Sequence, residues 1–248
     1  MCGRFTQQRP ASELAEIFGA EPLIDDPGGH YNVAPTDEAA VVVQRDERRA
    51  ITAYRWGLIP HWADSPKVAA RMFNARSETL TRSPAFSDAV RRKRCLVPVD
   101  GFYEWQRIDG RRQPFTIGRA DRRPLALAGL WSGWRDRSTD VEEPEGAAAG
   151  PAVVRTFTIV TTGPNEQLAS LHARMPVVVP ERAWDLWLDP GVADLAELRG
   201  LFEPTDEIRL RIDPVRDLVN NVRNDGPELV EPIDLGSVRA ETPVGLFD

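Results

Sequence analysis

Lysine is nearly absent from this chain of 248 residues. Of its 31 basic residues, only Lys67 and Lys93 are lysines, and the others are arginines. Contacts to anionic partners therefore depend on arginine, whose planar guanidinium grips phosphate as a fork. The net charge of −7 argues against a surface coated in positive charge for bulk nucleic-acid binding. A local basic groove remains compatible with that balance.

Cysteine and histidine are also scarce. The two cysteines, Cys2 and Cys95, cannot build a disulfide framework and indicate a reducing compartment. Three histidines and no close Cys/His cluster argue against a structural zinc site. No apolar run approaches the ~18 residues of a membrane span, and the start MCGRF lacks a signal region. We therefore expect a monomer of the cytoplasm or nucleoid, with neither a metal nor an organic cofactor.

Short apolar segments separated by turn residues predict many strands and few helices. Strands are expected at residues 39–44, 50–56, 95–99, 102–107, 114–118, 125–131, 156–161, 208–212 and 215–218. Asp109-Gly110 predicts a hairpin turn between two of them. Helices are expected at residues 12–18, 84–92, 181–188 and 192–198. Strands and helices do not alternate as βαβ units require, so we predict an α+β fold with a mostly antiparallel, barrel-like sheet and a few flanking helices.

One segment interrupts this pattern. Residues 136–151 (DRSTDVEEPEGAAAGP) are acidic, rich in alanine, glycine and proline, and aperiodic. They predict a flexible surface insertion, with a domain linker as the alternative. Because the flanking segments both resemble strands of one sheet, we favour a single domain over residues 1–231. Residues 232–248 are expected to form a weakly ordered tail.

Cys2 offers unusual chemistry if Met1 is removed. Its α-amine, with an ordinary pKa of about 7.7–8.0, is then partly neutral and nucleophilic at neutral pH. The amine can attack an aldehyde to give a Schiff base, and the thiol can close a five-membered thiazolidine ring. A cysteine at position 2 can equally be accidental. Cys95 begins an apolar strand and is interpreted as core packing.

Four short motifs, the first of which contains Cys2, bear on the role of this cysteine. They are MCGRF at 1–5, NARSE at 74–78, GFYEW at 101–105 and HARMP at 172–176, supported by YNVAP at 31–35 and WGLIPHW at 56–62. Each is weak alone, but their number and order make chance improbable. From Met1 to about Glu231 the chain resembles the SOS response-associated peptidase (SRAP) family, whose members cross-link to abasic sites. The family often carries Trp-Trp where this chain has His61-Trp62.

The resemblance implies roles for four residues. Cys2 would be the nucleophile, and Glu104 the general acid/base. His172 would assist proton transfer at the opened sugar and reversal of the link, and Asn74 would hold the reacting group by hydrogen bonds. Strand alternation puts Glu104 on the face of Phe102, and a buried carboxylate is costly unless it is paired or functional. A lone histidine is more often structural, and an isolated asparagine is most often a cap or turn residue.

Neighbouring residues are candidates for DNA binding. Arg4, Arg76 and Arg174 lie within two residues of these candidates and are interpreted as phosphate contacts, with internal salt bridges as the alternative. Pro35, Trp62 and Trp56 could form an apolar or stacking surface for bases, although Trp56 could equally be core. The basic run at 91–94 ends a predicted helix and is expected to be solvated.

The resulting hypothesis is an enzyme of the DNA damage (SOS) response. It would sense abasic sites in single-stranded DNA, or at single/double-strand junctions, and shield them in a thiazolidine cross-link. The family name implies a protease (hydrolase) activity that removes Met1, although a methionine aminopeptidase could do so, and the Schiff-base step is lyase-type chemistry. The alternatives are a cysteine peptidase that acts on other proteins and a non-covalent module that binds single-stranded DNA.

Overall fold

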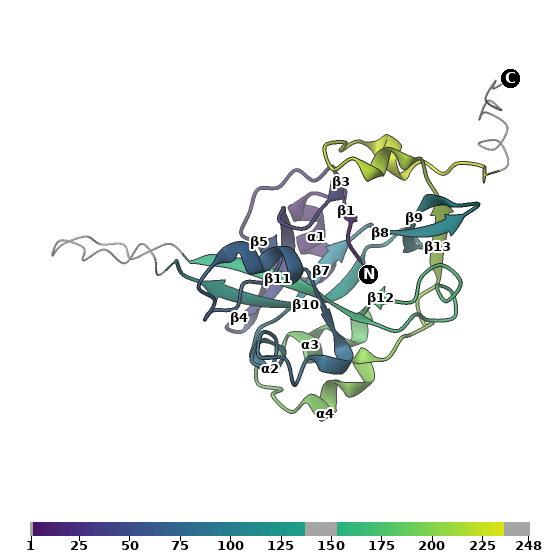
Figure 1. The fold of residues 1–248 in the computed structure, drawn as a ribbon. Helices are drawn as coiled ribbons and strands as arrows, with labels where there is room; N and C mark the ends of the chain where they lie inside the picture. The colour runs from purple at the N-terminus through teal and green to yellow at the C-terminus, as the bar shows by residue number, and fades with distance from the viewer. Residues whose placement is uncertain (1, 137–152, 236–248) are drawn as a thin grey trace, which may run out of the picture.

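The computed structural model describes residues 2–136 and 153–235, and it confirms an α+β fold (Figure 1). All but the first residue of the predicted insertion at 136–151, and most of the predicted tail at 232–248, lie outside these residues. The two strands that flank the insertion, β10 and β11, pair antiparallel over six residue pairs. Within the described ranges, no helix is long and apolar enough to cross a membrane.

The larger sheet closes into a barrel. Its strands run in the order β12-β11-β10-β7-β4-β5-β2, with β6 beside β11. Their bounds are β2 Ala20–Pro22, β4 Glu38–Arg45, β5 Arg48–Trp56, β6 Asn74–Arg76, β7 Arg94–Val99, β10 Leu125–Trp134, β11 Val154–Thr162 and β12 Met175–Pro176. A parallel pairing of β11 with β5, through Phe157 and Trp56, joins the second strand from each end of this path. The five strands β4, β5, β11, β10 and β7 therefore form a closed, mostly antiparallel ring.

A second sheet carries the N-terminus. It has the order β13-β9-β8-β1-β3. Its bounds are β1 Phe5–Gln7, β3 His30–Val33, β8 Gly101–Ile108, β9 Arg111–Arg119 and β13 Leu210–Pro214. The hairpin predicted between β8 and β9 is confirmed. Asp109 and Gly110 have φ of 50° and 78°, the positive values that a tight type I′ turn requires.

Successive side chains along the strands point to opposite faces, so the strands contribute to two hydrophobic cores. In β4, Val41 and Val43 pack with Phe5 and Trp56, whereas Val42 packs against the helices. The helices are α1 Ala11–Phe18, α2 Ala89–Arg92, α3 Trp184–Leu188 and α4 Leu195–Leu198. Short 3₁₀ turns complete the fold at η1 Pro66–Arg71, η2 Ser77–Thr79, η4 Glu181–Ala183, η5 Arg199–Phe202, η6 Asp217–Asn220 and η7 Pro227–Val230. The cores leave the N-terminus beside β8 (Figure 1).

Several predicted elements are changed by tertiary packing. Helix α1 matches its prediction and ends at Gly19, whose left-handed backbone (φ 58°) accounts for the stop. The helices predicted at 84–92 and 192–198 shrink to their last turns, α2 and α4. The strand predicted at 215–218 is wrong. A 3₁₀ turn there returns Val219 to the side of Val215, where both pack on Tyr103.

The prediction that the basic run at 91–94 is solvated is wrong for Arg94. Its side chain is buried, and the guanidinium lies 5.8 Å from the ring of Trp187. It donates hydrogen bonds to the backbone carbonyls of Val90, Arg91, Trp187 and Asp189. The last carbonyls of a helix have no partner within it, and arginine has five donors, so Arg94 satisfies the ends of α2 and α3 together.

Candidate active site

Strand β1 delivers the start of the chain to β8. Phe5 pairs with Phe102 in antiparallel register, and the amide of Tyr103 donates to the carbonyl of Arg4 over 2.9 Å. Continuing this register carries the residues before β1 along β8 toward Glu104. Cys2 is a free cysteine that is fully buried. Cys2 is therefore held inside the molecule.

Asn74 anchors the backbone of Cys2. It begins strand β6, which lies parallel to β11, and its Nδ2 donates to the carbonyl of Cys2 over 2.7 Å. The other end of the amide, Oδ1, is buried without a hydrogen-bond partner within the part of the chain that the structure describes. Leaving a buried acceptor unsatisfied costs about 1–3 kcal/mol. Such a group is suited to receive a hydrogen bond from a bound ligand.

Glu104 is a buried carboxylate next to the thiol. It is 4% exposed and shares the inward face of β8 with Phe102. Burial raises the pKa of Glu104, although the neighbouring His172 opposes the shift. Burial also raises the pKa of the Cys2 thiol, and the negative charge of Glu104 raises it further. Both groups are thereby biased toward their neutral, protonated forms.

His172 completes the cluster from the loop between β11 and β12. Its Nε2 lies 3.7 Å from Oε2 of Glu104. Its Nδ1 lies 3.0 Å from the amide nitrogen and 2.9 Å from the carbonyl oxygen of Arg174. Nδ1 thus has a donor when it is unprotonated and an acceptor when it is protonated. The ring can gain or lose a proton while this contact holds its orientation.

Strand β11 brings two distant motifs together. Arg76 in β6 pairs with Thr161 of β11, and Met175 in β12 pairs with Thr162. Nη2 of Arg174 donates to the carbonyl of Thr161 over 2.6 Å, and the same guanidinium binds Glu78. Glu78 was given no role from sequence. A single sequence carries no signal that pairs residues 78 and 174, because only the shared strand makes them neighbours.

The three arginines proposed as phosphate contacts differ in their surroundings. Arg76 is exposed, and its side chain makes no hydrogen bond or ion pair within the described ranges. Nη1 of Arg4 donates to Oδ1 of Asn32 over 2.7 Å and to the carbonyl of Val219 over 2.8 Å. Burial lowers the pKa of Arg4. The alternative of internal pairing thus describes Arg4 and Arg174 as they stand, whereas Arg76 is directed to solvent.

The residues proposed to stack on bases also differ in their exposure to solvent. Trp62 is 50% exposed and Pro35 is half-buried. Trp56 is fully buried, and its Nε1 donates to the carbonyl of Phe73 over 2.8 Å. Trp56 is therefore core and not part of a stacking surface, because its ring packs against Phe5 and Phe157.

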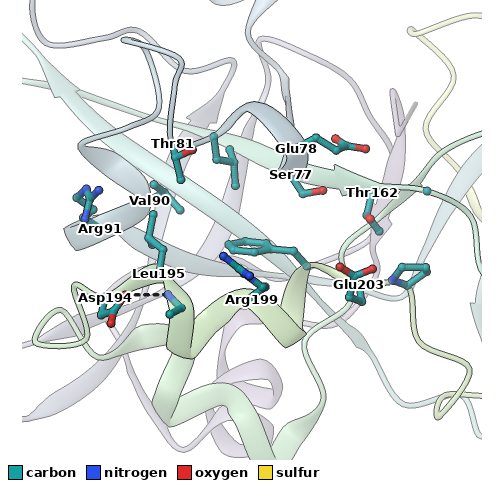
Figure 2. Close-up of a pocket in the computed structure, with 15 residues that line it drawn as sticks. Ser77, Glu78, Thr81, Val90, Arg91, Thr162, Asp194, Leu195, Arg199 and Glu203 are labelled. Carbon is teal, nitrogen blue, oxygen red and sulfur yellow. Dashed lines mark hydrogen bonds between the residues drawn. The ribbon is translucent and has the colours of Figure 1, made fainter.

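A cavity of about 690 Å³ lies beside this cluster rather than within it. Ser77, Glu78 and Thr162 stand at one end, and Thr81 and Arg91 stand at the other (Figure 2). None of the four catalytic candidates lines it. No group of three or more His, Cys, Asp or Glu residues within 2–136 and 153–235 is arranged to hold a metal ion.

Known proteins resemble this chain along nearly its whole length. Residues 1–222 match the family model described as "SOS response associated peptidase (SRAP)". The abasic site processing protein YoqW of Bacillus subtilis is 36% identical over 93% of this chain and 99% of its own length. The abasic site processing protein YedK of Escherichia coli is 30% identical over 94% of this chain and 100% of its own. The abasic site processing protein HMCES of Pongo abelii is 31% identical and covers 95% of this chain and 77% of its own.

Solved structures share the fold. A protein from Bacteroides thetaiotaomicron superposes with a TM-score of 0.80 at 24% identity, covering 94% of this chain and all of that one. A phage-related protein from Bordetella bronchiseptica superposes with a TM-score of 0.63 at 28% identity, covering 87% and 95% of the two chains. The barrel and its second sheet are therefore a recurrent architecture.

Proposed function

The chain belongs to the SOS response associated peptidase (SRAP) family, and we propose that it captures abasic sites in single-stranded DNA through a covalent bond to Cys2. The relatives YoqW, YedK and HMCES carry the name abasic site processing protein. An abasic site in its ring-opened form presents an aldehyde. Capture of that aldehyde would shield the lesion from strand cleavage during the DNA damage response.

One observation carries the proposal: four polar groups from four separate segments meet at the start of the chain. Asn74 holds the carbonyl of Cys2, and Glu104 lies within electrostatic reach of its thiol. His172 faces Glu104 across 3.7 Å. A buried carboxylate beside a thiol is unfavourable for folding and is suited to proton transfer, so the cluster is better explained by chemistry than by stability.

Removal of Met1 is the first step that we propose. The peptide nitrogen of Cys2 then becomes a primary amine, which can act as a nucleophile. The proposal includes removal by the chain itself, acting as an autopeptidase, or by a methionine aminopeptidase. In both cases the product is a 1,2-aminothiol held in place by Asn74.

The covalent chemistry then proceeds in two stages. The amine of Cys2 attacks C1′ of the open sugar, and the carbinolamine loses water to give a Schiff base. As the thiol loses its proton to a neighbouring base, the sulfur adds to the same carbon and the protonated Schiff-base nitrogen becomes a neutral secondary amine. The product is a thiazolidine, formed from aldehyde and aminothiol with net loss of one water. Since the ring removes the imine, the lyase-type strand cleavage that a Schiff base permits is suppressed.

Glu104 and His172 are assigned to proton transfer. The raised pKa of Glu104 favours its protonated form, which can donate to the departing hydroxyl of the carbinolamine. The resulting carboxylate can accept the thiol proton. His172 can exchange protons with Glu104 in either direction, because both of its Nδ1 states have a partner on Arg174. The same pair would serve reversal of the cross-link.

DNA binding is assigned to the rim of the site. Arg76 is the first candidate for a phosphate contact, because its guanidinium is exposed, and Arg4 and Arg174 would need to exchange internal partners. Trp62, half exposed, is a candidate platform for a base beside the gap, with Pro35 as a further apolar contact.

The proposal is tested with an oligonucleotide that contains one abasic site. The wild-type protein should form an adduct that survives a denaturing gel, and an intact strand should form none. A Cys2→Ala variant that gives the same stable adduct would overturn the proposal. Retention of abasic strands by the wild-type protein without any adduct would favour a non-covalent binding module, and cleavage of protein substrates would favour a peptidase.

A further inference from the structure

We propose that Glu78 is an internal substitute for a DNA phosphate: its carboxylate occupies Arg174 in the free protein, and strand binding exchanges carboxylate for phosphate. The inference rests on the proposed function, in which Arg174 contacts DNA. It adds a residue to that function that sets how tightly any strand is held. Glu78 touches none of the reacting atoms and acts only through Arg174.

The contact has the form of a phosphate site. Nη1 of Arg174 binds Oε1 of Glu78, and Nη2 lies 3.1 Å from Oε2. Two parallel N–H···O bonds are the arrangement by which arginine holds both carboxylates and phosphates. Nη2 also donates to the carbonyl of Thr161 over 2.6 Å. The end of the guanidinium that could grip a phosphate is therefore already filled.

The two partners are unequally fixed. The side chain of Arg174 is 19% exposed, whereas that of Glu78 is 54% exposed. Arg174 is also held by Thr161 and by its own backbone at His172. Glu78 stands on the short turn η2 at the end of the cavity, with solvent available to its carboxylate (Figure 2). Glu78 is thus the partner that can leave, and Arg174 the one that stays.

The charges of Glu78 and of the phosphate determine how the exchange affects strand affinity and its dependence on salt. The hydrogen bond from Arg174 lowers the pKa of Glu78, so the carboxylate is ionised in the free protein. A phosphate that takes its place leaves the carboxylate to solvent and its counterions, so this contact releases little net salt. An exposed ion pair contributes ~0.2–1 kcal/mol, so the competition should lower strand affinity only modestly. The exchange takes place on the side chain of Arg174, the same residue whose backbone orients His172.

The experiment compares Glu78→Gln with a matched control, Glu207→Gln. Glu207 binds Arg182 through the same two-bond fork, at 2.6 and 2.7 Å, and is 53% exposed. Each substitution removes one negative charge and one such fork. Affinity for an intact fluorescent single strand is measured by anisotropy over a series of salt concentrations. The intact strand separates binding from cross-linking.

Glu78→Gln should bind the intact strand roughly 2–5-fold more tightly, the fold-change that corresponds to an exposed ion pair. Its slope of log K against log salt should steepen by about 0.7, the value for one more phosphate neutralised on a single strand. Glu207→Gln should change neither quantity. In an Arg174→Ala background, Glu78→Gln should have no effect.

Equal affinity and slope for Glu78→Gln and wild type, or equal gains in both Gln variants, would overturn the inference. A gain that persists in the Arg174→Ala background would also overturn it, because the effect would then not pass through Arg174. These failures leave the proposed function standing wherever wild type still cross-links an abasic strand. If wild type neither binds nor cross-links DNA, the proposed function fails and the inference with it.

Discussion

The two cysteines lie in the same core cluster but have contrasting polar neighbours. Cys2 and Cys95 are both free, fully buried thiols whose pKa values are raised by burial. Around Cys95, in strand β7, the neighbours are apolar, and a Cβ placed on Gly129 would lie only 2.6 Å from its sulfur. Around Cys2 stand a carboxylate, an amide and an imidazole. Burial and a raised pKa are thus common to both, and only the polar neighbours differ.

A buried thiol can therefore be assigned a role from its polar neighbours rather than from its burial or its pKa. Cys95 fills space among the side chains of the barrel core. At Cys2 the fold tolerates a buried carboxylate and an unsatisfied amide oxygen, features that cost stability. Such costs are typical of sites where binding or catalysis gains from them. The comparison predicts that changes at the two regions will act on different measurements.

The largest expected effect comes from exchanging each thiol for alanine. Cys2→Ala should lose the stable cross-link entirely yet keep an amine that forms a Schiff base, which borohydride would trap. Cys95→Ala should cross-link at the wild-type rate and lose about 1 kcal/mol of stability, as for one buried methyl group. Time courses of adduct yield with and without borohydride, together with Tm values, test both. A stable adduct from Cys2→Ala would remove the contrast between the two thiols.

Glu104→Gln should slow cross-linking by roughly 10²-fold, the contribution typical of a positioned acid/base, while nearly keeping the side chain's shape. Binding to an intact strand should be unchanged, because Glu104 is buried. Single-turnover rates on one abasic oligonucleotide measure the effect, with intact-strand affinity as the control. A wild-type rate would exclude Glu104 from proton transfer.

His172→Ala should slow cross-link formation and reversal more than it weakens DNA binding. The imidazole faces Glu104 and can pass protons in both directions. Forward rates, and release of a preformed adduct into excess competitor aldehyde, measure the two directions. If only binding affinity falls, His172 has a structural role at Arg174 and no role in catalysis.

Glu104→Gln should also separate catalysis from stability. Burial raises the pKa of Glu104 in the folded state. The protonated carboxyl therefore contributes to folding stability. This contribution is complete at pH values below the ordinary glutamate pKa of about 4.3, and it is lost as the pH rises through the raised pKa of the folded state. Because the Gln side chain does not ionise, the variant keeps its stability as the pH rises. Its Tm should exceed that of wild type by about 2–4 °C at neutral pH, which corresponds to a stability difference of ~1 kcal/mol. The gain should vanish near pH 4, and an equal gain at both pH values would contradict this origin.

The smallest effect is expected at the rim. Arg76→Ala should weaken binding to intact and abasic strands alike, by roughly 2–10-fold for one phosphate contact, without changing the cross-linking rate at saturation. The overall salt dependence should be shallow, because the chain carries a net charge of −7 and two of the three proposed phosphate contacts, Arg4 and Arg174, already have internal partners. A slope equivalent to about ten phosphate contacts would contradict this interpretation.

The sequence predicted local features well where local physics decides them. The helix ending at Gly19 and the Asp109-Gly110 hairpin depend on backbone conformations that particular residues favour, and both are present. The closure of the barrel through β5 and β11 depends on a parallel contact between residues about 100 positions apart. No periodicity in the chain encodes that pairing.

The same distinction between local features and long-range pairing applies to the candidate active site. The motifs indicated Cys2 and Asn74 together, and a hydrogen bond joins them. Arg94 is expected in solvent because its basic run ends a predicted helix, but the unpaired carbonyls of two helix ends hold it inside. Arg174 and Glu78 belong to different motifs that only β11 brings together. Sequence thus indicated motifs whose residues the fold brings close together, but not how their side chains pair.

The most direct test of the central claim is the intact mass of the cross-linked species, followed by mapping of the attached peptide. We expect the mass of the chain beginning at Cys2, plus the abasic oligonucleotide, minus one water, with the attachment on the N-terminal peptide. An adduct that retains Met1, or one attached at Cys95, would contradict it.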